Sequence, residues 1–374
     1  MSRWFAVQSQ RRRDMDPIVY DAIVVGARCA GSPTAMLLAR RGYRVLLLDR
    51  DRFPGDIMST HLIKTGGVLR LRRWGLLERI VATGCPAVTQ ITLDIGGCAL
   101  TAPMSPLEGV AEIHAPRRTV LDKILVDAAV AAGAELREGA TVRELLRNGE
   151  RVVGVRVRIG QGAIVEERAG IVIGADGLRS AVARAVEPPT YEVVPTRACW
   201  YYSYWSGVDL ADFRIHLRGG RYILAFPTND GLTCVLLGWP ISMFHQVRGD
   251  IDHHARAALR EAAPDLAQRI AAGCREERFV GQPMSRGSFA VPSGRGGHSS
   301  GTPGTIAIRA PAGASRMRFA MPSCSVTRST PRTPVMRRDA ELGGRIDGLD
   351  HRVLGLESRV ALLESPRPRR RRRR

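Results

Sequence analysis

The segment that most constrains the fold runs from residue 18 to 49 and reads IVYDAIVVGARCAGSPTAMLLARRGYRVLLLD. Its first eight residues are mostly apolar and rich in β-branched side chains, which is typical of a buried parallel strand. Gly26 then provides a turn, a helical pattern of apolar residues begins at Gly31, and a second apolar strand ends at Asp49. Strand, glycine turn, helix and strand together predict a βαβ unit.

The turn between this strand and helix has the composition of a dinucleotide site. Gly26 permits the tight turn, Gly31 lets the helix pack closely on the strand, and the helix N-terminus offers amides to a pyrophosphate. Asp49 ends the second strand, where a carboxylate accepts hydrogen bonds from a ribose. Arg28 stands at the middle glycine of the usual GxGxxG pattern, and a guanidinium there can still bind a pyrophosphate. We expect these four residues and Arg50 to bind the cofactor, with a βαβ unit without a nucleotide as the alternative.

The rest of the chain up to residue 280 divides into two patterns. Helical periodicity at 61–84 and 118–133, together with apolar strands ending at AGIVIGADG, continues the α/β pattern. Between 190 and 240 the segments alternate and are rich in aromatic residues, with an NDG turn between two of them, which predicts an antiparallel sheet. The expected fold class is therefore α/β, a Rossmann-like parallel sheet with an antiparallel β-sheet domain.

Four segments in order carry a family resemblance: GARCAGSPTAMLLARRGYRVLLLDR, FPGDIMSTHLI, PRRTVLDKILVDAAVAAGAEL and VIGADGLRSAVAR. They resemble the class A FAD-dependent monooxygenases, the p-hydroxybenzoate hydroxylase-like family, over roughly residues 18–280. The resemblance implies that Arg118, which begins an R-x-x-L helix, contacts FAD, and that Thr60 lies in the stretch along the ribityl chain. It also implies that Asp176 and Gly177 lie near the flavin and the nicotinamide cofactor.

The resemblance further implies the chemistry. An enzyme of this family reduces FAD with NAD(P)H and uses O2 to hydroxylate an aromatic or polyketide-like small molecule, so we expect no nucleophile and assign no catalytic residue. Trp200, Tyr202 and Tyr204 alternate onto one face of the predicted sheet, and with Tyr222 and Phe226 they are candidates for the substrate wall. Packing in the sheet core is the alternative for each of them.

Other functions remain open. A prenyl-chain reductase of similar fold is one alternative, and a flavin halogenase is less favoured because Trp200 and Trp205 do not form the WxWxIP signature. A basic coiled-coil interaction protein that retains a degenerate flavoprotein body is another. Seven scattered cysteines, without a CxxC pair or clustered histidines, predict neither a disulfide framework nor a metal site.

The composition divides the chain into six regions. We expect segments of the substrate domain around 86–115 to be interleaved with the FAD-binding domain. In the last helix the apolar residues are alternately four and three positions apart, which predicts an apolar seam that supports a weak homodimer. The regions are a disordered extension at 1–17, the FAD-binding domain at 18–185, the substrate sheet and helices at 186–280, a low-complexity disordered segment at 281–339, a heptad helix at 340–364 and a poly-Arg tail at 365–374.

The segment 281–340 lacks a motif that the family needs. The family has a late Gly-Asp pair whose Asp binds the flavin-side ribose, whereas nearly half of this segment is Gly, Pro, Ser or Thr and Asp339 is its one acidic residue. If GC-rich codons are assumed for this segment, moving the reading frame by one base permits a translation that contains GPGW, GDAG and SDAFRDAE in the family's order. We therefore hypothesise a frameshift that leaves the flavin site incomplete, with a genuine disordered linker as the alternative.

The net charge of +20 does not by itself indicate nucleic-acid binding. Lys64 and Lys123 are the only lysines among 56 basic residues, a ratio that reflects GC-rich coding, and seven arginines lie in the final eight residues. No apolar run approaches the roughly 18 residues of a membrane span, and the first residues lack a signal-peptide pattern. We expect a cytoplasmic protein that binds a small-molecule substrate, and neither nucleic acid nor membrane.

Overall fold

The computed structural model describes residues 20–59, 62–149, 151–177, 179–187, 190–194, 197–283, 287–290 and 306–307. All of them belong to the first of two compact units, Met1–Met317, and the second, Arg318–Arg374, lies outside the described residues. The predictions for the N-terminal extension, the heptad helix with its dimer seam and the poly-Arg tail therefore fall outside the described structure.

The first sheet contains the predicted βαβ unit. Strand β1 pairs in parallel with both β2 and β8, and β2 pairs in parallel with β5. Residues of β1 and β2 are buried almost throughout, which explains their continuous apolar sequence. The path across the sheet is β5 (Glu135–Arg137), β2 (Val45–Leu48), β1 (Tyr20–Val25), β8 (Ile164–Gly174), β7 (Arg151–Ile159) and β6 (Ala140–Asn148).

Only part of this sheet is parallel. Strands β6, β7 and β8 pair antiparallel because short turns join them, whereas parallel neighbours need a crossover. The short strand β17 (Ile306–Ala307) pairs in parallel with β8.

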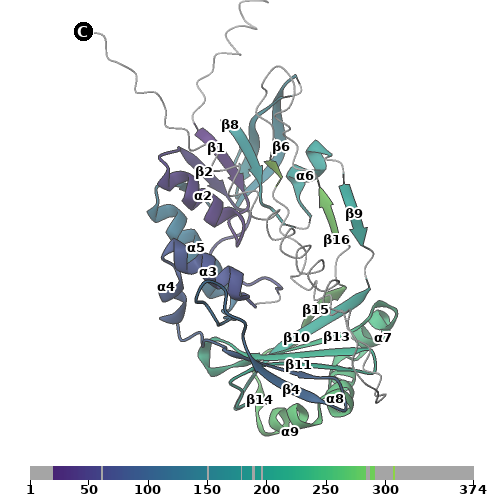
Figure 1. Cartoon of the computed structure of the whole chain (residues 1–374). Coiled ribbons are helices and arrows are strands. Elements are labelled where there is room, and N and C mark those ends of the chain that lie inside the picture. Colours follow the sequence, from purple (N-terminus) through teal and green to yellow (C-terminus); the bar gives the residue numbers. More distant parts are fainter. Residues whose placement is uncertain are drawn as a thin grey trace, which may run out of the picture. The chain divides into compact units, whose positions relative to one another are not determined.

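Helices pack on the sheet and form its core. Figure 1 shows α2 and α5 side by side next to β1 and β2. Met36 of α2 and Leu125 of α5 pack in one buried cluster with Val24 and Leu47 from the strands. The helices of this layer are α2 (Gly31–Arg40), α3 (Thr65–Trp74), α4 (Leu77–Val81) and α5 (Arg118–Ala131). On the opposite face Val182 of α6 (Ala181–Val186) packs against Ile23 and Val172.

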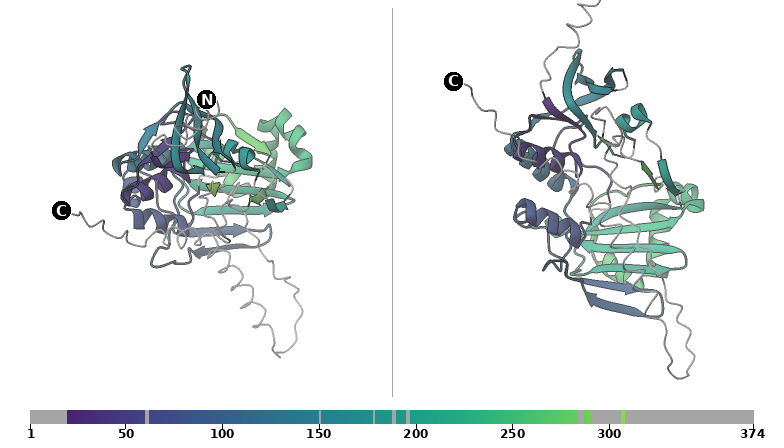
Figure 2. Two further views of the ribbon diagram at one scale, coloured as in Figure 1. Left: turned by 90° about the horizontal axis from the view of Figure 1, so that it is seen from above. Right: turned by 45° about the horizontal axis from the view of Figure 1, so that its top comes forward.

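The second sheet is the expected antiparallel one, with one parallel pair. Strand β10 pairs antiparallel with β13, β13 with β12 and β12 with β11, but β11 pairs in parallel with β3. Figure 2 shows these strands side by side, with the blue-grey β3 and β4 at the edge. The path is β14 (Cys274–Arg275), β10 (Ala198–Ser206), β13 (Thr233–Pro240), β12 (Arg221–Pro227), β11 (Phe213–Arg218), β3 (Gln90–Asp94) and β4 (Ala99–Pro103).

Three helices cover one face of this sheet. Ala258, Leu259 and Leu266 pack there against Leu237 and Trp239 of β13. The helices are α7 (Phe244–Gly249), α8 (Ile251–Ala262) and α9 (Pro264–Ala272). Among the described residues no helix is long and apolar enough to span a membrane.

The segment that begins at residue 281 differs in part from expectation. We expected no regular structure there, but β15 (Val280–Pro283) pairs with β10, and β16 (Gly287–Ala290) pairs with β9 (Thr190–Val194). Together with β17, these strands take their backbone partners from strands distant in sequence, which local composition cannot predict. The remainder of 281–339 lies outside the described residues.

The NDG turn between β12 and β13 attaches the antiparallel sheet to the helical layer. The side chain of Asn229 is buried; its Oδ1 accepts a hydrogen bond from the backbone amide of Arg117 at 2.9 Å. Its Nδ2 donates to the carbonyl oxygen of Thr83 at 3.0 Å and to the Thr83 hydroxyl at 2.9 Å. Next to it, the hydroxyl of Thr228 donates to the carbonyl oxygen of Ala115 at 2.6 Å. One amide side chain thus joins three segments.

Replacing Asn229 with Ala should destabilise the protein. The change leaves the amide of Arg117 and the carbonyl of Thr83 without this partner, and each buried group left unsatisfied costs about 1–3 kcal/mol. Urea unfolding should therefore show a lower free energy of unfolding for Asn229→Ala. The control is Asp230→Asn, an exposed change in the same turn at a positive φ that Asn tolerates. Equal stability of Asn229→Ala and the unmodified chain would contradict the role of this side chain.

Candidate functional site

The turn between β1 and α2 requires both of its predicted glycines. Gly26 has a φ of 101°, and a Cβ there would lie 2.4 Å from the carbonyl oxygen of Ala175. A Cβ at Gly31 would lie 1.6 Å from the carbonyl oxygen of Gly26. Close packing of the helix start on β1 and β8 therefore leaves room for no side chain at either position. The first helical turn begins after Ala30, which provides no side-chain cap. The amide of Ser32 donates to the carbonyl oxygen of Arg28 at 3.0 Å and Pro33 has no N–H, so Gly31 is the residue of this turn whose amide can serve an anion.

Asp49 follows β2 and fixes the other side of this turn. It is 6% exposed; its Oδ2 accepts a hydrogen bond from the amide of Ala27 at 2.6 Å, and its Oδ1 accepts one from the amide of Asp51 at 2.8 Å. Burial raises the pKa of the Asp49 carboxyl above its ordinary value, although both amides lower it. Each carboxylate oxygen can accept a further hydrogen bond. Asp49 is therefore able to accept one from a ribose hydroxyl, which is the role predicted for it.

Arg28 points from the turn toward a different element. Its Nη1 donates to Asp122 Oδ2 at 2.6 Å, and its Nη2 donates to Asp51 Oδ2 at 3.0 Å. The guanidinium also lies over the ring of Phe53, 5.3 Å from the centroid. Its side chain is 16% exposed. The sequence predicted Arg28 as a cofactor contact but gave no indication of these protein partners.

Arg118 reaches the same carboxylate from the first turn of α5. Its Nε donates to Asp122 Oδ1 at 3.1 Å and its Nη2 to Asp122 Oδ2 at 2.8 Å. Asp122 is completely buried. The spacing of Arg118 and Asp122, four residues apart on a predicted helix, could have indicated this pair. The sharing of Asp122 with Arg28 could not, because it is a tertiary contact.

The other predicted cofactor residues differ in their surroundings. Asp176 accepts hydrogen bonds through Oδ2 from the amides of Ala181 and Val182, at 2.6 and 3.3 Å, and so caps α6. Its buried Oδ1 has no partner among the described residues. Gly177 has a φ of 77°, which favours glycine. Arg50 is largely exposed, with its Nε 3.9 Å from Asp51, and its cofactor contact stays a prediction. Thr60 lies outside the described residues.

These observations fit FAD at the adenosine and pyrophosphate end. A glycine turn without space for Cβ atoms, an uncapped helix start and an unpartnered buried oxygen on Asp176 are features that a dinucleotide would satisfy. A bound FAD would be held there by Asp49, by the amide of Gly31 at the start of α2, and by the guanidiniums of Arg28 and Arg118.

The predicted aromatic residues of the second sheet do share one face. Tyr202, Tyr204 and Phe226 are buried in one cluster, and Trp200 packs against it. The ring of Trp200 lies 5.8 Å from that of Tyr222, and Gly238 lies between them on β13. A Cβ at Gly238 would approach the Trp200 ring to 2.7 Å, so this glycine makes room for the ring. Tyr222 remains 44% exposed.

Sequence reasoning missed Arg117, which belongs to this face. Its guanidinium lies 4.4 Å from the centroid of the Tyr204 ring and pairs with Glu277. Burial raises the pKa of the Tyr204 hydroxyl well above its ordinary value. Arg117 and Arg118 thus contact the aromatic face and the nucleotide turn respectively, although they are adjacent in the chain. The only sequence signal for this arrangement was the arginine pair at the helix start.

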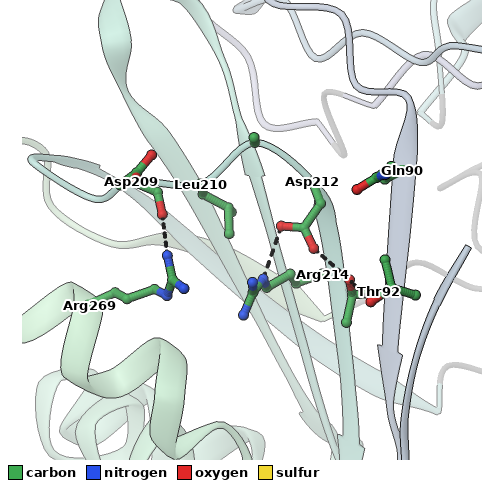
Figure 3. Close-up of a pocket in the computed structure, with 9 residues that line it drawn as sticks. Gln90, Thr92, Asp209, Leu210, Asp212, Arg214 and Arg269 are labelled. Atoms are coloured by element: carbon green, nitrogen blue, oxygen red, sulfur yellow. Dashed lines mark hydrogen bonds and ion pairs between the residues drawn. The ribbon is translucent and has the colours of Figure 1, made fainter. Parts of the chain in front are cut away.

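A polar cavity of about 360 Å³ lies elsewhere, at the edge of the second sheet (Figure 3). Its two arginines already have partners, because Arg214 Nε donates to Asp212 at 3.0 Å and Arg269 donates to the carbonyl oxygen of Asp209 at 2.6 Å. The hydroxyl of Thr92 also donates to Asp212 at 2.5 Å. No residue of the nucleotide turn lines this cavity, so we do not assign the cofactor to it.

Three side chains on the helical side of that sheet have metal-ligating types. Atoms of Asp94, His216 and Asp265 lie within 4.8 Å of one another. Asp94 already accepts a hydrogen bond from the amide of Gly96 at 2.7 Å, and Asp265 pairs with Arg214 at 2.6 Å. These contacts account for both carboxylates without an ion.

Sequence comparison finds relatives that include a reductase and a monooxygenase. Digeranylgeranylglycerophospholipid reductase 2 of Methanopyrus kandleri is 31% identical over 233 residues, 59% of this chain and 54% of that protein. The 6-methylpretetramide 4-monooxygenase of Streptomyces rimosus is 27% identical over 257 residues, 67% of this chain and 60% of that protein. The chain thus spans little more than half the length of the curated relatives it matches.

Solved structures show the same fold. The myxobacterial chondrochloren halogenase CndH, an FAD-dependent halogenase, matches with a TM-score of 0.67 and 20% identity, over 78% of this chain and 68% of that one. PqsL of Pseudomonas aeruginosa, solved with 2-aminobenzoylacetate, matches with a TM-score of 0.63 and 19% identity, over 77% of this chain and 78% of that one. At these identities the likeness shows the fold alone.

The family itself follows from the extent of one match. The family described as FAD binding domain matches residues 19–289, which contain the glycine turn, Asp49, Arg118, Asp176 and the aromatic sheet. The chain therefore belongs to the FAD-binding domain family of class A monooxygenase-like flavoproteins.

Proposed function

We propose that this protein is an FAD-dependent monooxygenase that hydroxylates an aromatic or polyketide-like small molecule with NAD(P)H and O2. The observation that carries the proposal is the start of α5. There Arg118 joins the nucleotide turn through Asp122, and Arg117 stacks on Tyr204 of the aromatic face. A cofactor bound at the turn and a substrate bound on that face would therefore both lie next to the N-terminal end of α5. The similarity to a 6-methylpretetramide 4-monooxygenase supports the proposal.

The protein's own residues would bind, orient and exclude water. FAD, when bound, supplies the hydride acceptance and the oxygen chemistry that side chains cannot. Asp49 would accept hydrogen bonds from a ribose, while Arg28 and Arg118 would offset the charge of the pyrophosphate. The accessible surfaces of Trp200 and Tyr222, next to the buried Tyr202 and Tyr204, would desolvate the substrate, and a dry site limits side reactions.

A reductase of prenyl chains is the second candidate. Archaeal digeranylgeranylglycerophospholipid reductases are 28–32% identical to this chain. An apolar sheet face could also hold a prenyl chain. The accessible rings of Trp200 and Tyr222 favour a flat aromatic substrate instead, because aromatic rings pack against one another in stacked or edge-to-face arrangements.

The two candidates predict different fates for oxygen. For the chain with its reading frame restored near residue 282, incubation with FAD, NAD(P)H, ¹⁸O2 and a panel of phenols, polycyclic aromatics and geranylgeranyl lipids should place ¹⁸O in an aromatic product. The chain as written should not couple NAD(P)H oxidation to hydroxylation. Mass spectrometry reads both outcomes, because oxygenation adds 18 mass units and saturation of one double bond adds two. Saturated prenyl products without ¹⁸O would replace the monooxygenase with the reductase.

Replacing Asp49 with Ala should weaken binding of FAD and of adenosine. The change removes a charged acceptor, and hydrogen bonds to charged groups contribute about 1.5–3 kcal/mol each, so the Kd should rise about tenfold or more. Quenching of flavin fluorescence measures FAD, and calorimetry measures adenosine. Asp127→Ala, on the exposed side of α5, is the control. An unchanged adenosine affinity in Asp49→Ala would disprove the ribose role.

The missing Gly-Asp motif leads to a prediction about the whole chain. Without that motif, the ribityl and ring portions of FAD lose charge-assisted contacts, and two such losses weaken binding on the order of a hundredfold. The chain as written should bind FAD weakly, and a version with the reading frame restored near residue 282 should bind it tightly. Equilibrium dialysis of both chains gives the comparison. Tight, stoichiometric FAD in the chain as written would refute the frameshift hypothesis.

A further inference from the structure

Asp122 occupies an unusual position for a carboxylate. It is completely buried within α5, yet it accepts hydrogen bonds from Arg28 of the nucleotide turn and from Arg118 of its own helix. The thiol of Cys29 contributes a fourth contact, at 3.4 Å from Oδ1. Burying a charge is costly unless it is paired and hydrogen-bonded. The two guanidiniums therefore offset the cost of burying the Asp122 carboxylate, and the carboxylate in turn fixes the positions of both guanidiniums.

Asp122 faces two cations. Arg28 and Arg118 bring two positive charges to its one negative charge, but two further acids lie close to Arg28. Asp51 is 42% exposed, so water screens its charge, whereas Asp49 is 6% exposed and its charge also acts on Arg28. The two arginines therefore carry no surplus positive charge. The feature that favours an anion at the turn is the uncapped N-terminus of α2, which carries a partial positive charge.

Both arginines also keep hydrogen-bond donors for a ligand. A guanidinium has five N–H groups. Arg28 directs Nη1 to Asp122 and to the carbonyl oxygen of Gly55, and Nη2 to Asp51, which leaves Nε without a partner among the described residues. Arg118 directs Nε and Nη2 to Asp122, which leaves Nη1 similarly unused in the described part of the chain. The side chains are 16% and 12% exposed, so each has a small accessible portion.

We propose that Asp122 is a positioning residue that holds Arg28 and Arg118 as a two-cation clamp for a diphosphate at the start of α2. This inference rests on the proposed function, because the diphosphate is that of the dinucleotide. It explains how the turn can bind a diphosphate although Arg28 replaces the middle glycine of the usual pattern. A glycine there would let phosphate oxygens approach the backbone closely, whereas a guanidinium held in place by Asp122 contacts them through its side chain.

Two ligand fragments separate positioning from general stability. ADP contains the diphosphate and adenosine does not, so only ADP should respond to the clamp. In calorimetric titrations of the full chain, Asp122→Asn should raise the Kd of ADP about tenfold, equivalent to 1.4 kcal/mol. The Kd of adenosine should stay within about twofold. A purely structural role would weaken both ligands together, and that result would overturn the proposal.

The same helix offers a matched control. Lys123 and Asp127 form another acid–base pair four residues apart, but both side chains are more than 40% exposed. Asp127→Asn removes a carboxylate charge from α5 without touching the turn, so the affinities for ADP and adenosine should not change. A loss of ADP affinity in Asp127→Asn equal to that in Asp122→Asn would show that any negative charge on α5 suffices, and would overturn the clamp.

A second variant keeps the test informative if Asp122→Asn folds poorly. Arg28→Gly removes one cation from the turn and restores the glycine of the usual pattern, while Arg118 still pairs with the buried Asp122. We expect about tenfold weaker ADP binding and unchanged adenosine binding. In the Arg28→Gly background, Asp122→Asn should weaken ADP binding less than it does alone, because one of the two cations that Asp122 holds is already absent. ADP binding as tight as in the unmodified chain would overturn the proposal.

The outcomes also distinguish this inference from the proposed function. An unmodified chain that binds neither ADP nor adenosine would refute the nucleotide site, and the clamp with it. An unmodified chain that binds ADP, with Asp122→Asn and Arg28→Gly binding it equally well, would refute the clamp alone.

Discussion

Two buried carboxylates hold the turn on which the rest of the site depends. Asp49 accepts the amide of Ala27 from one side, and Asp122 binds the guanidinium of Arg28 from the other. Burying either carboxylate without these donors would be costly. The turn is thus fixed by hydrogen bonds from two elements distant in sequence, while the contact of Gly31 with Gly26 fixes the start of α2 on the sheet.

The same helix end connects the turn to the second sheet. Asn229 binds the amide of Arg117, the side chain of Arg117 stacks on Tyr204, and the next residue, Arg118, contacts Asp122. Adjacent residues therefore serve the two halves of the protein. A shift of α5 would disturb the nucleotide turn and the aromatic face together, which gives a physical basis for oriented binding of a cofactor and a substrate.

Local periodicity explains what the sequence could predict. The apolar runs around Ile23 and Leu47 indicate burial on both faces of the first sheet, which is confirmed. The predicted residues from Trp200 to Tyr204 share one face, but β10 is also buried on its other face, where Tyr201 packs under the helices. Arg28 and Asp122 are 94 residues apart in the sequence, and the paired strands β11 and β3 are also far apart in the sequence. Neither contact therefore leaves a local pattern. The strands after residue 280 escaped prediction for the same reason. The polar Asn229 and the cation of Arg117 could be assigned only once their partners were known.

A crystal structure of the full chain with ADP would test the central claim most directly. The account predicts the diphosphate at the N-terminus of α2, with oxygens in hydrogen-bond contact with Arg28 and Arg118 and a ribose hydroxyl against Asp49. ADP bound at another surface, or a turn in which Arg28 fills the phosphate position and leaves no room for the ligand, would contradict it.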